Sequence, residues 1–262
     1  MASSFLTSFK NIHAYRELVW SLVVSDLKVR YKNSVLGFFW TLLNPLLMTV
    51  ILWAVFVFLF KVDIPNFHVF LLIGLVAWRF FAIGTSTAML NLVGKANLVK
   101  KVYFPREVLV FSSSLYALIS SLLEFIAVFA VLVFSGIQLS FPILLFPVVL
   151  LLEFVLVYGV SLAISALYVY YRDMSNVWEV VLNAGFYLTP IFYSRDFIPS
   201  AYRFVLDFNP LAHLVELFRQ VLLYAEFPSV MPVVFSVVFG LLFVVLGWSV
   251  FARFEPDFAE KL

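Results

Sequence analysis

Residues 142–152 form the sequence PILLFPVVLLL, which contains no charged or hydrogen-bonding side chain. The longer run 141–170 holds a single charged residue, Glu153. About 20 helical residues, at about 1.5 Å each, suffice to cross the roughly 30 Å hydrocarbon core of a membrane. A strand of a membrane barrel would instead alternate apolar and polar side chains. The run therefore predicts a membrane-spanning helix.

Five other apolar runs have a similar character. Hydrophobic residues make up 64% of the 262-residue chain and charged residues 12%, and the mean hydropathy is +1.07. A soluble domain is about 45–50% apolar and about 25% charged, so a soluble globular protein is excluded. We expect an all-α integral membrane protein whose transmembrane domain covers residues 34–254. Its six predicted transmembrane helices are residues 34–60, 67–93, 108–135, 141–170, 177–193 and 231–252.

The charge balance and the cysteine and histidine counts exclude several kinds of site. The net charge of +2, from 17 Lys and Arg against 15 Asp and Glu, is too weak for a nucleic-acid-binding surface. The chain has no cysteine and three histidines, so we expect neither disulfides nor a metal site.

Motifs of membrane-bound and nucleotide-dependent enzymes are also missing. The sequence has no H-E-x-x-H and no G-x-S-x-G. Its Gly94-Lys95 pair lacks the earlier glycine and the following Ser or Thr of a phosphate-binding loop. We therefore expect no catalytic residue and no bound cofactor in this chain, and no ATP hydrolysis by the chain alone.

Cations are distributed unevenly between the predicted loops. With the N-terminus placed in the cytoplasm, 12 of the 17 Lys and Arg fall in inner segments and 4 in outer segments, and Arg79 lies within a span. The positive-inside rule therefore predicts that both termini are cytoplasmic, including a short tail over residues 255–262. Residues 1–10 lack the pattern of a signal peptide, so we expect the first span to direct insertion.

Residues 1–33, ahead of the first span, are predicted to form an N-terminal helix and an elbow. Between residues 11 and 32 the apolar positions fall on one helical stripe, which favours an amphipathic helix lying in the cytoplasmic interface. The alternative is that residues 18–27 simply pack on the helix bundle. The stripe consists of Ile12, Tyr15, Val19, Leu22 and Val23.

Residues 194–229 form a long, apolar outer segment before the last span. We expect two short re-entrant helices there, one over residues 200–208 and one after the Asn209-Pro210 cap. The second carries an apolar stripe that is too costly to leave in water, opposed by a polar face that includes His213 and Arg219. We interpret the segment as an outer gate, and the alternative is a lid that only caps the bundle. The gate candidates are Leu211, Leu214 and Phe218.

Three ionisable residues stand out within the predicted spans, where charges are costly and therefore candidates for function. Arg79, Glu124 and Glu153 lie 11 or 12 residues from the outer ends of their spans, so all three are expected at a depth of about 16–18 Å. Either an Arg-Glu pair fixes helix register, or these groups line a polar path.

The fifth predicted span is short and interrupted by Gly185 and Pro190. Such residues free backbone groups that lipid cannot satisfy, so this helix is expected to face protein or a water-filled path. Aromatic rings beside such a path can stack on sugar rings, although packing or an aromatic belt is the alternative for each of them. The channel-lining candidates are Trp40, Asn183, Phe186, Tyr187, Phe192 and Tyr193.

The loop 94–107 is short, basic and predicted to be cytoplasmic. Its cations are explained by membrane anchoring alone, but an exposed aromatic pair is not. We hypothesise that the loop docks a cytosolic subunit. The candidate docking residues are Lys100, Lys101, Tyr103, Phe104, Pro105 and Arg106.

Five blocks of sequence, in order along most of the chain, resemble the signature of ABC-2 type permeases of the polysaccharide/O-antigen export family. Capsule and teichoic-acid permeases are similar as well. The blocks are DLKVRYKNSVLGFFW at 26–40 with NPL at 44–46, KKVYFPRE at 100–107, YRDM at 171–174 with Trp178, TPIFY at 189–193, and NPL at 209–211.

This resemblance implies a homodimer in the bacterial inner membrane, with two copies of a cytosolic ATPase subunit that holds ATP and Mg²⁺. It also implies a channel between the first and fifth spans of both copies and an undecaprenyl-diphosphate-linked glycan as substrate, among membrane lipids. For such a substrate, Arg30 and Lys32, with Arg16 as a weaker candidate, would receive the diphosphate. Ordinary membrane anchoring is the alternative for these cations.

Other functions remain to be distinguished from this one. A capsule, teichoic-acid, lipid or drug exporter of the same superfamily is the nearer rival. A membrane enzyme acting on lipid-linked sugars is the other class, but it would need a convergent set of acids or phosphate-binding groups at one interface, and the sequence offers none.

Overall fold

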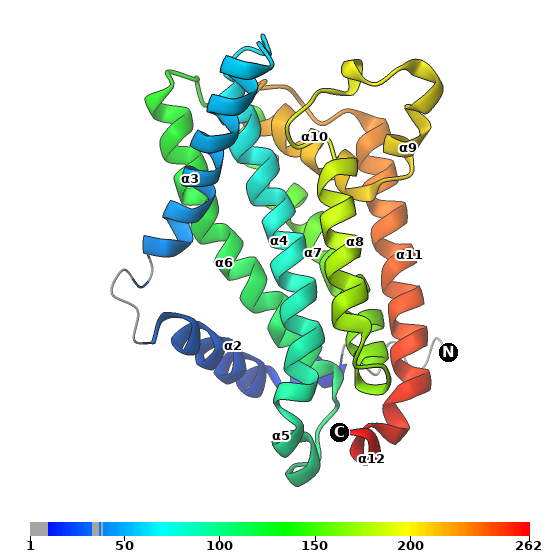
Figure 1. The fold of residues 1–262 in the computed structure, drawn as a ribbon. Coiled ribbons are helices and arrows are strands. Elements are labelled where there is room, and N and C mark those ends of the chain that lie inside the picture. Colours follow the sequence, from blue (N-terminus) through cyan, green and yellow to red (C-terminus); the bar gives the residue numbers. More distant parts are fainter. Residues whose placement is uncertain (1–9, 33–36, 38) are drawn as a thin grey trace.

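The computed structural model describes residues 10–32, 37 and 39–262, and this part of the chain is built from helices, with no strand (Figure 1). Five of its helical segments are long and apolar enough to cross a membrane. They are α3 (Phe39–Ala54), which continues as the π-helical turn η1 (Val55–Leu59), α4 (Phe67–Gly94), α6 (Glu107–Phe134), α7 (Phe146–Tyr170), preceded by the 3₁₀ turn η2 (Phe141–Leu145), and α11 (Val230–Phe254).

The fifth predicted span, residues 177–193, is a helix, but a short one. α8 (Met174–Leu188) has 15 residues, or about 22 Å. It ends because Thr189, which precedes Pro190, has the extended backbone (φ −90°, ψ 136°) that proline imposes on its predecessor. Five predicted spans are thus confirmed as helices of spanning length, and the prediction that the fifth is interrupted is confirmed at its proline.

The short helices gather at the two ends of the bundle (Figure 1). α2 (Arg16–Tyr31) lies across one end, where α5 (Ala96–Lys101) and α12 (Phe258–Lys261) are also found; we call this the α2 end. α9 (Phe204–Asp207) and α10 (Pro210–Leu222) lie at the opposite end, the α10 end.

The predicted N-terminal helix is present as α2. Val19, Leu22 and Val23 are buried, and α2 packs on α6. Trp20, on another face, is 57% exposed. The stripe therefore packs on the bundle, as in the second of the two interpretations, and the interfacial location of the helix stays a prediction.

The segment predicted as a cytoplasmic tail is folded onto the bundle. The 3₁₀ turn η5 (Glu255–Asp257) leads into α12, whose Phe258 is fully buried and meets Phe251 edge to face, with ring centroids 5.4 Å apart. Burial of this ring attaches the last residues of the chain to the α2 end.

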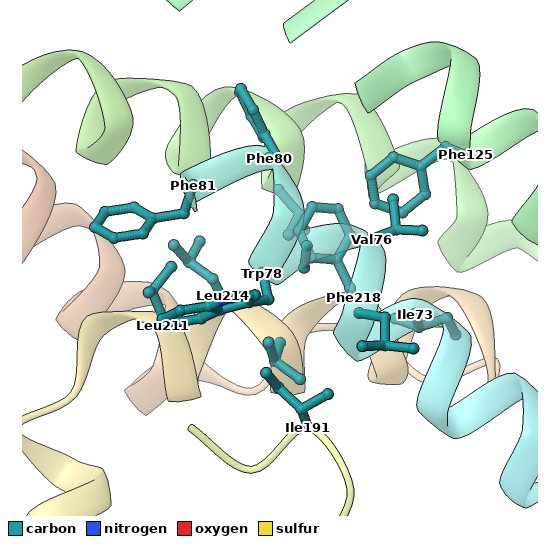
Figure 2. Close-up of a cluster of buried hydrophobic side chains, with 14 of the residues drawn as sticks. Ile73, Val76, Trp78, Phe80, Phe81, Phe125, Ile191, Leu211, Leu214 and Phe218 are labelled. Atoms are coloured by element: carbon teal, nitrogen blue, oxygen red, sulfur yellow. The ribbon is translucent and has the colours of Figure 1, made fainter. Parts of the chain in front are cut away.

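α4 is the central helix of the molecule. In its most apolar window 78% of residues are buried, against 11% in the α3 segment and 22% in α11. Figure 2 shows why: Trp78, Phe80 and Phe81 of α4 lie among side chains from α6, α10 and the segment after α8. α3 and α11 therefore form the periphery, and α4 links the other elements.

α7 and α11 approach each other at glycines. A Cβ added to Gly159 would lie 2.5 Å from the backbone nitrogen of Val244, and a Cβ added to Gly247 would overlap the carbonyl oxygen of Gly159. Small residues let helix backbones approach closely in membranes, where packing rather than hydrophobic burial drives association. The pair Gly159 and Gly247 thus sets the separation of α7 and α11.

We expect Gly159→Ala to lower the thermal unfolding midpoint of the detergent-purified protein by several degrees, because the added methyl must push α11 away and overpacking of this kind costs about 1–3 kcal/mol. Gly94→Ala is the matched control, since a Cβ there meets nothing within 4 Å. Equal midpoints for the two variants would contradict this account of the contact.

Candidate functional site

The exposed face of α8 carries polar side chains. Asn176, Glu179, Asn183 and Tyr187 are spaced by three or four residues, so they share one face, and all four are exposed. Polar and ionisable groups in a membrane helix are costly against lipid and usually face protein or water. We call this face the α8 polar face; against lipid it would cost free energy.

The α8 polar face contains two predicted channel residues, Asn183 and Tyr187, and two that the sequence analysis missed. Glu179 is one helical turn before Asn183, and Asn176 is one turn earlier. Glu179 lies within the predicted span 177–193 and Asn176 directly precedes it, so their three- and four-residue spacing was the signal that could have found them. Trp40, also predicted, is 49% exposed on α3.

The other predicted channel aromatics pack into the protein. Phe192 stacks on Phe56 with ring centroids 5.2 Å apart, and Phe186 meets Trp78 edge to face at 5.9 Å. The Tyr193 hydroxyl donates a hydrogen bond of 3.0 Å to the carbonyl oxygen of Tyr187. These three side chains are half-buried, so they support the end of α8, and a channel-lining role for them stays a prediction.

The interruption after α8 is satisfied by the start of α10. The Asn209 amide nitrogen donates to the carbonyl oxygen of Leu188 at 3.3 Å and to Thr189 Oγ1 at 3.0 Å. The Asn209 side-chain oxygen accepts from the backbone nitrogens of Leu211 and Ala212 at 3.0 and 3.4 Å. The predicted Asn-Pro cap is thus confirmed, and the same side chain binds the two helix ends together.

Arg219 makes a second connection to this interruption. Its Nη2 donates to the carbonyl oxygens of Ile191 at 2.8 Å and Phe70 at 3.3 Å, and its guanidinium carbon lies 3.3 Å from the centroid of the Phe70 ring. The side chain is 1% exposed. A guanidinium can be buried in this way because carbonyl acceptors and an aromatic face replace its hydration.

Both faces of α10 are buried. Its apolar stripe is buried as predicted, with Leu211, Leu214 and Phe218 at 6%, 1% and 0% exposure, in the cluster of Figure 2. His213 and Arg219 on the other face are buried as well, because the segment after α8 and the start of α11 cover that face. Neither observation tests the gate role.

Two of the three predicted intramembrane charges are paired. Arg79 Nε and Nη2 donate to the two carboxylate oxygens of Glu124, each at 3.0 Å, and Arg79 Nη1 donates to Asn44 Oδ1 at 2.8 Å. This bidentate pair joins α4 to α6, and Asn44 attaches α3 to both. Glu153 is apart from it: the side chain is fully buried, and neither carboxylate oxygen has a partner among the described residues.

Arg30 of α2 contacts α6. Its Nη1 donates to Tyr116 Oη at 3.0 Å and to Ser120 Oγ at 3.4 Å. Within the part of the chain that the structure describes, no carboxylate pairs with it. The other two predicted headgroup residues, Arg16 and Lys32, are exposed, whereas Arg30 is half-buried.

A polar network missed by the sequence analysis lies beside Arg30. Asp26 of α2 accepts from Lys95 Nζ at 2.8 Å and from Asn91 Nδ2 at 3.0 Å, and Asn91 also donates to Ser113 Oγ at 2.9 Å. These bonds connect α2 to α4 and α6. They show that the cations at the α2 end are not only lipid anchors.

The predicted docking loop is divided between exposed and buried residues. Tyr103 is 97% exposed, and Lys100 and Lys101 at the end of α5 are exposed too. The expectation that Phe104 is exposed is wrong: it is 5% exposed, within a core cluster at the α2 end. Arg106 is held by the carbonyl oxygen of Glu255, which accepts from Nη1 at 2.9 Å, and like Pro105 it is half-buried. Of the candidate docking residues, Lys100, Lys101 and Tyr103 are therefore the exposed ones.

Among the described residues, no three His, Cys, Asp or Glu side chains are grouped so that they could hold a metal ion.

Comparisons with known proteins agree with these features. Residues 17–223 match the family described as ABC-2 type transporter. Two proteins of Klebsiella pneumoniae, each named O-antigen export system permease protein RfbA, are 31% and 30% identical over 251 residues, which is 94% of this chain and 95% of theirs. The RfbA protein of Myxococcus xanthus is 27% identical, with 97% of this chain and 98% of that protein covered.

We expect Glu124→Leu to destabilise the protein by about 3 kcal/mol, because it leaves Arg79 without its carboxylate partner. The double variant Arg79→Met with Glu124→Leu should regain most of that stability, because it removes the unpaired charge. Unfolding in detergent micelles measures both. Glu226→Leu, which alters an exposed acid, is the control. A double variant no more stable than the single one would show that the unpaired charge is not the cause.

Proposed function

The chain belongs to the ABC-2 type transporter family, and from this premise we propose that it is the permease subunit of an exporter of O-antigen-like polysaccharide. Its relatives with that function match it from end to end. The exported molecule is a glycan on an undecaprenyl-diphosphate lipid, which moves from the cytoplasmic to the periplasmic side of the bacterial inner membrane.

The α8 polar face is the observation that carries this proposal. A chain this apolar has no reason to expose Glu179 and Asn183 at membrane depth unless a hydrophilic substrate or water passes there. In a homodimer the α8 polar faces and the exposed side of α3 from two copies enclose a path, with Trp40 and Tyr187 as stacking surfaces for sugar rings. α8 is then the sixth span, completed by residues 189–193.

The α2 end faces the cytoplasm in this proposal, with both termini on that side. Lys100, Lys101 and Lys28 are exposed at this end, as the positive-inside rule requires. α2 lies in the inner interface, where Arg30, held by neutral partners only, is the cation available to a diphosphate. Lys32 and Arg16 attract the headgroup from the membrane surface.

The energy source is a separate subunit. This chain carries no phosphate-binding loop, so ATP and Mg²⁺ belong to two copies of a cytosolic ATPase partner that docks on Lys100, Lys101 and Tyr103. At the other end, α9 and α10 are the re-entrant gate. Leu211, Leu214 and Phe218 hold it closed by packing on α4.

The experiment is export in cells that lack their own O-antigen permease. We expect the wild-type chain, with its ATPase, to restore surface polysaccharide. The double variant Glu179→Leu with Asn183→Leu should lower export about tenfold or more, because each lost hydrogen bond to a charged or polar group is worth about 0.5–3 kcal/mol. The control is Val177→Leu with Val181→Leu, which changes exposed apolar residues of the same helix. Full export by the first double variant would refute the channel face. Failure of the wild type, with export of a capsule, teichoic acid or lipid instead, would refute the O-antigen assignment.

We expect Tyr103→Ala to abolish stimulation of the partner's ATPase with little change in thermal stability, because Tyr103 is exposed. In contrast, Phe104→Ala should lower the unfolding free energy by about 3–5 kcal/mol, because Phe104 is buried. ATPase assays and thermal unfolding of the co-purified complex measure the two effects. Normal stimulation by the Tyr103 variant would refute the docking role.

A further inference from the structure

A polar pocket of about 620 Å³ lies at the α10 end, away from the α8 polar face. It is enclosed by the buried polar side of α10, the segment after α8 and the start of α11. Its volume is within the range of about 300–1,000 Å³ that is typical of small-molecule sites. Its polar lining residues are Ser194, Arg195, Asp196, His213, Glu216, Arg219, Gln220, Tyr224 and Ser229.

The pocket is built from a fixed hydrogen-bonding frame. Gln220 Nε2 donates to Ser229 Oγ at 2.8 Å, and Gln220 Oε1 accepts from the Ser229 backbone nitrogen at 2.9 Å. Gln220 Nε2 also lies 3.5 Å from a carboxylate oxygen of Glu216, one turn earlier. The frame holds the Glu216 carboxylate at the pocket wall, where its remaining acceptor positions are free for a ligand.

Arg219 supplies a second sign that the pocket takes a ligand. It is nine-tenths or more buried and lines the pocket, and its Nε has no acceptor among the described residues. Buried donors without acceptors are rare because they cost free energy. A pocket lined by a guanidinium and a carboxylate is suited to groups that both donate and accept.

The charges of the pocket select among ligands. Glu216 and Asp196 oppose Arg195 and Arg219, so the lining has no excess of either sign. Such a lining offers no net attraction to a diphosphate, because two carboxylates offset the two guanidiniums, and none to a metal ion or polyamine for the converse reason. Hydroxyl groups suit a lining of mixed donors and acceptors, and Tyr224, 43% exposed, adds an aromatic surface.

We propose that this pocket binds one neutral sugar residue of the glycan at the α10 end, with the Glu216 carboxylate accepting from its hydroxyls, Gln220 holding that carboxylate in place and Tyr224 contacting its ring. The inference rests on the proposed export function and adds a sugar site outside the channel. Arg219 lines the pocket and also donates to the Ile191 carbonyl oxygen. A sugar in the pocket would therefore lie next to the side chain that connects α10 to the end of α8.

The test uses the full-length permease with its ATPase partner in lipid nanodiscs. The probe is surface polysaccharide from cells with restored export, released from its lipid by mild acid, cut to short chains and labelled at its reducing end. We expect Glu216→Gln to weaken binding about tenfold and Tyr224→Leu to weaken it as well, while Tyr224→Phe retains it. Glu226→Gln is the matched control, because Glu226 lies at the same end but outside the pocket.

A local readout separates this pocket from the channel. The chain has no cysteine, so Met231→Cys, at the pocket, and Phe227→Cys, outside it, each give one thiol at a position where the native side chain is 64% exposed. We expect the probe to slow maleimide labelling of the Met231→Cys variant severalfold and not that of the Phe227→Cys variant.

Three results would overturn the sugar site while leaving the export function intact: restored export without binding of the probe, equal binding by Glu216→Gln and Glu226→Gln, or equal labelling of the two cysteines. If the wild-type chain restores no surface polysaccharide, the proposed function fails first, and the sugar site fails with it.

Discussion

The satisfaction of backbone polar groups where α8 is interrupted is the constraint on which the rest of this structure depends. A helix that ends inside or near a membrane leaves carbonyl groups that lipid cannot bond. Here Leu188 and Ile191 receive donors from Asn209 and Arg219, both of which belong to α10. α10 is therefore held in place by two things: its apolar stripe packs on α4, and its side chains donate to the unpaired carbonyl groups at the end of α8. As a result, the α10 end of the molecule forms as one unit.

A second set of polar contacts follows α6. Ser113, Tyr116, Ser120 and Glu124 are spaced by three or four residues along one face, and they bond in turn to Asn91, Arg30 and Arg79. Each bond connects α6 to another helix, α2 or α4. In lipid, helix association gains little from apolar burial, so such hydrogen bonds and close glycine contacts specify which helices are neighbours. Glu153 lies outside this set, and its buried carboxylate oxygens have no hydrogen-bond partner among the described residues.

The sequence predicts the helices well and the burial of polar residues poorly. α4 (Phe67–Gly94) differs by one residue from the predicted span 67–93 because apolar periodicity, proline and glycine act locally. Arg219 could not be placed, since its acceptors are 28 and 149 residues away and are backbone carbonyls, which have no sequence signature. Phe104 was misjudged for a related reason: its neighbours in the basic loop are exposed, whereas its burial comes from a cluster that includes α2 and α11. Glu179 was overlooked because a lone acid in a helix acquires meaning only when the exposure of its face is known.

The exposed surfaces of this chain are of two kinds, one apolar and one polar. α3 and α11 expose leucine, valine and phenylalanine, and for these side chains lipid is a sufficient partner. The α8 polar face is different, because a carboxylate, two amides and a phenol along one face cost free energy against hydrocarbon. The exposed side of α8 is therefore the surface of the described chain that lipid alone does not satisfy. This asymmetry supports the proposal that a second copy encloses a hydrophilic path between α8 and α3, and that α11 faces the membrane.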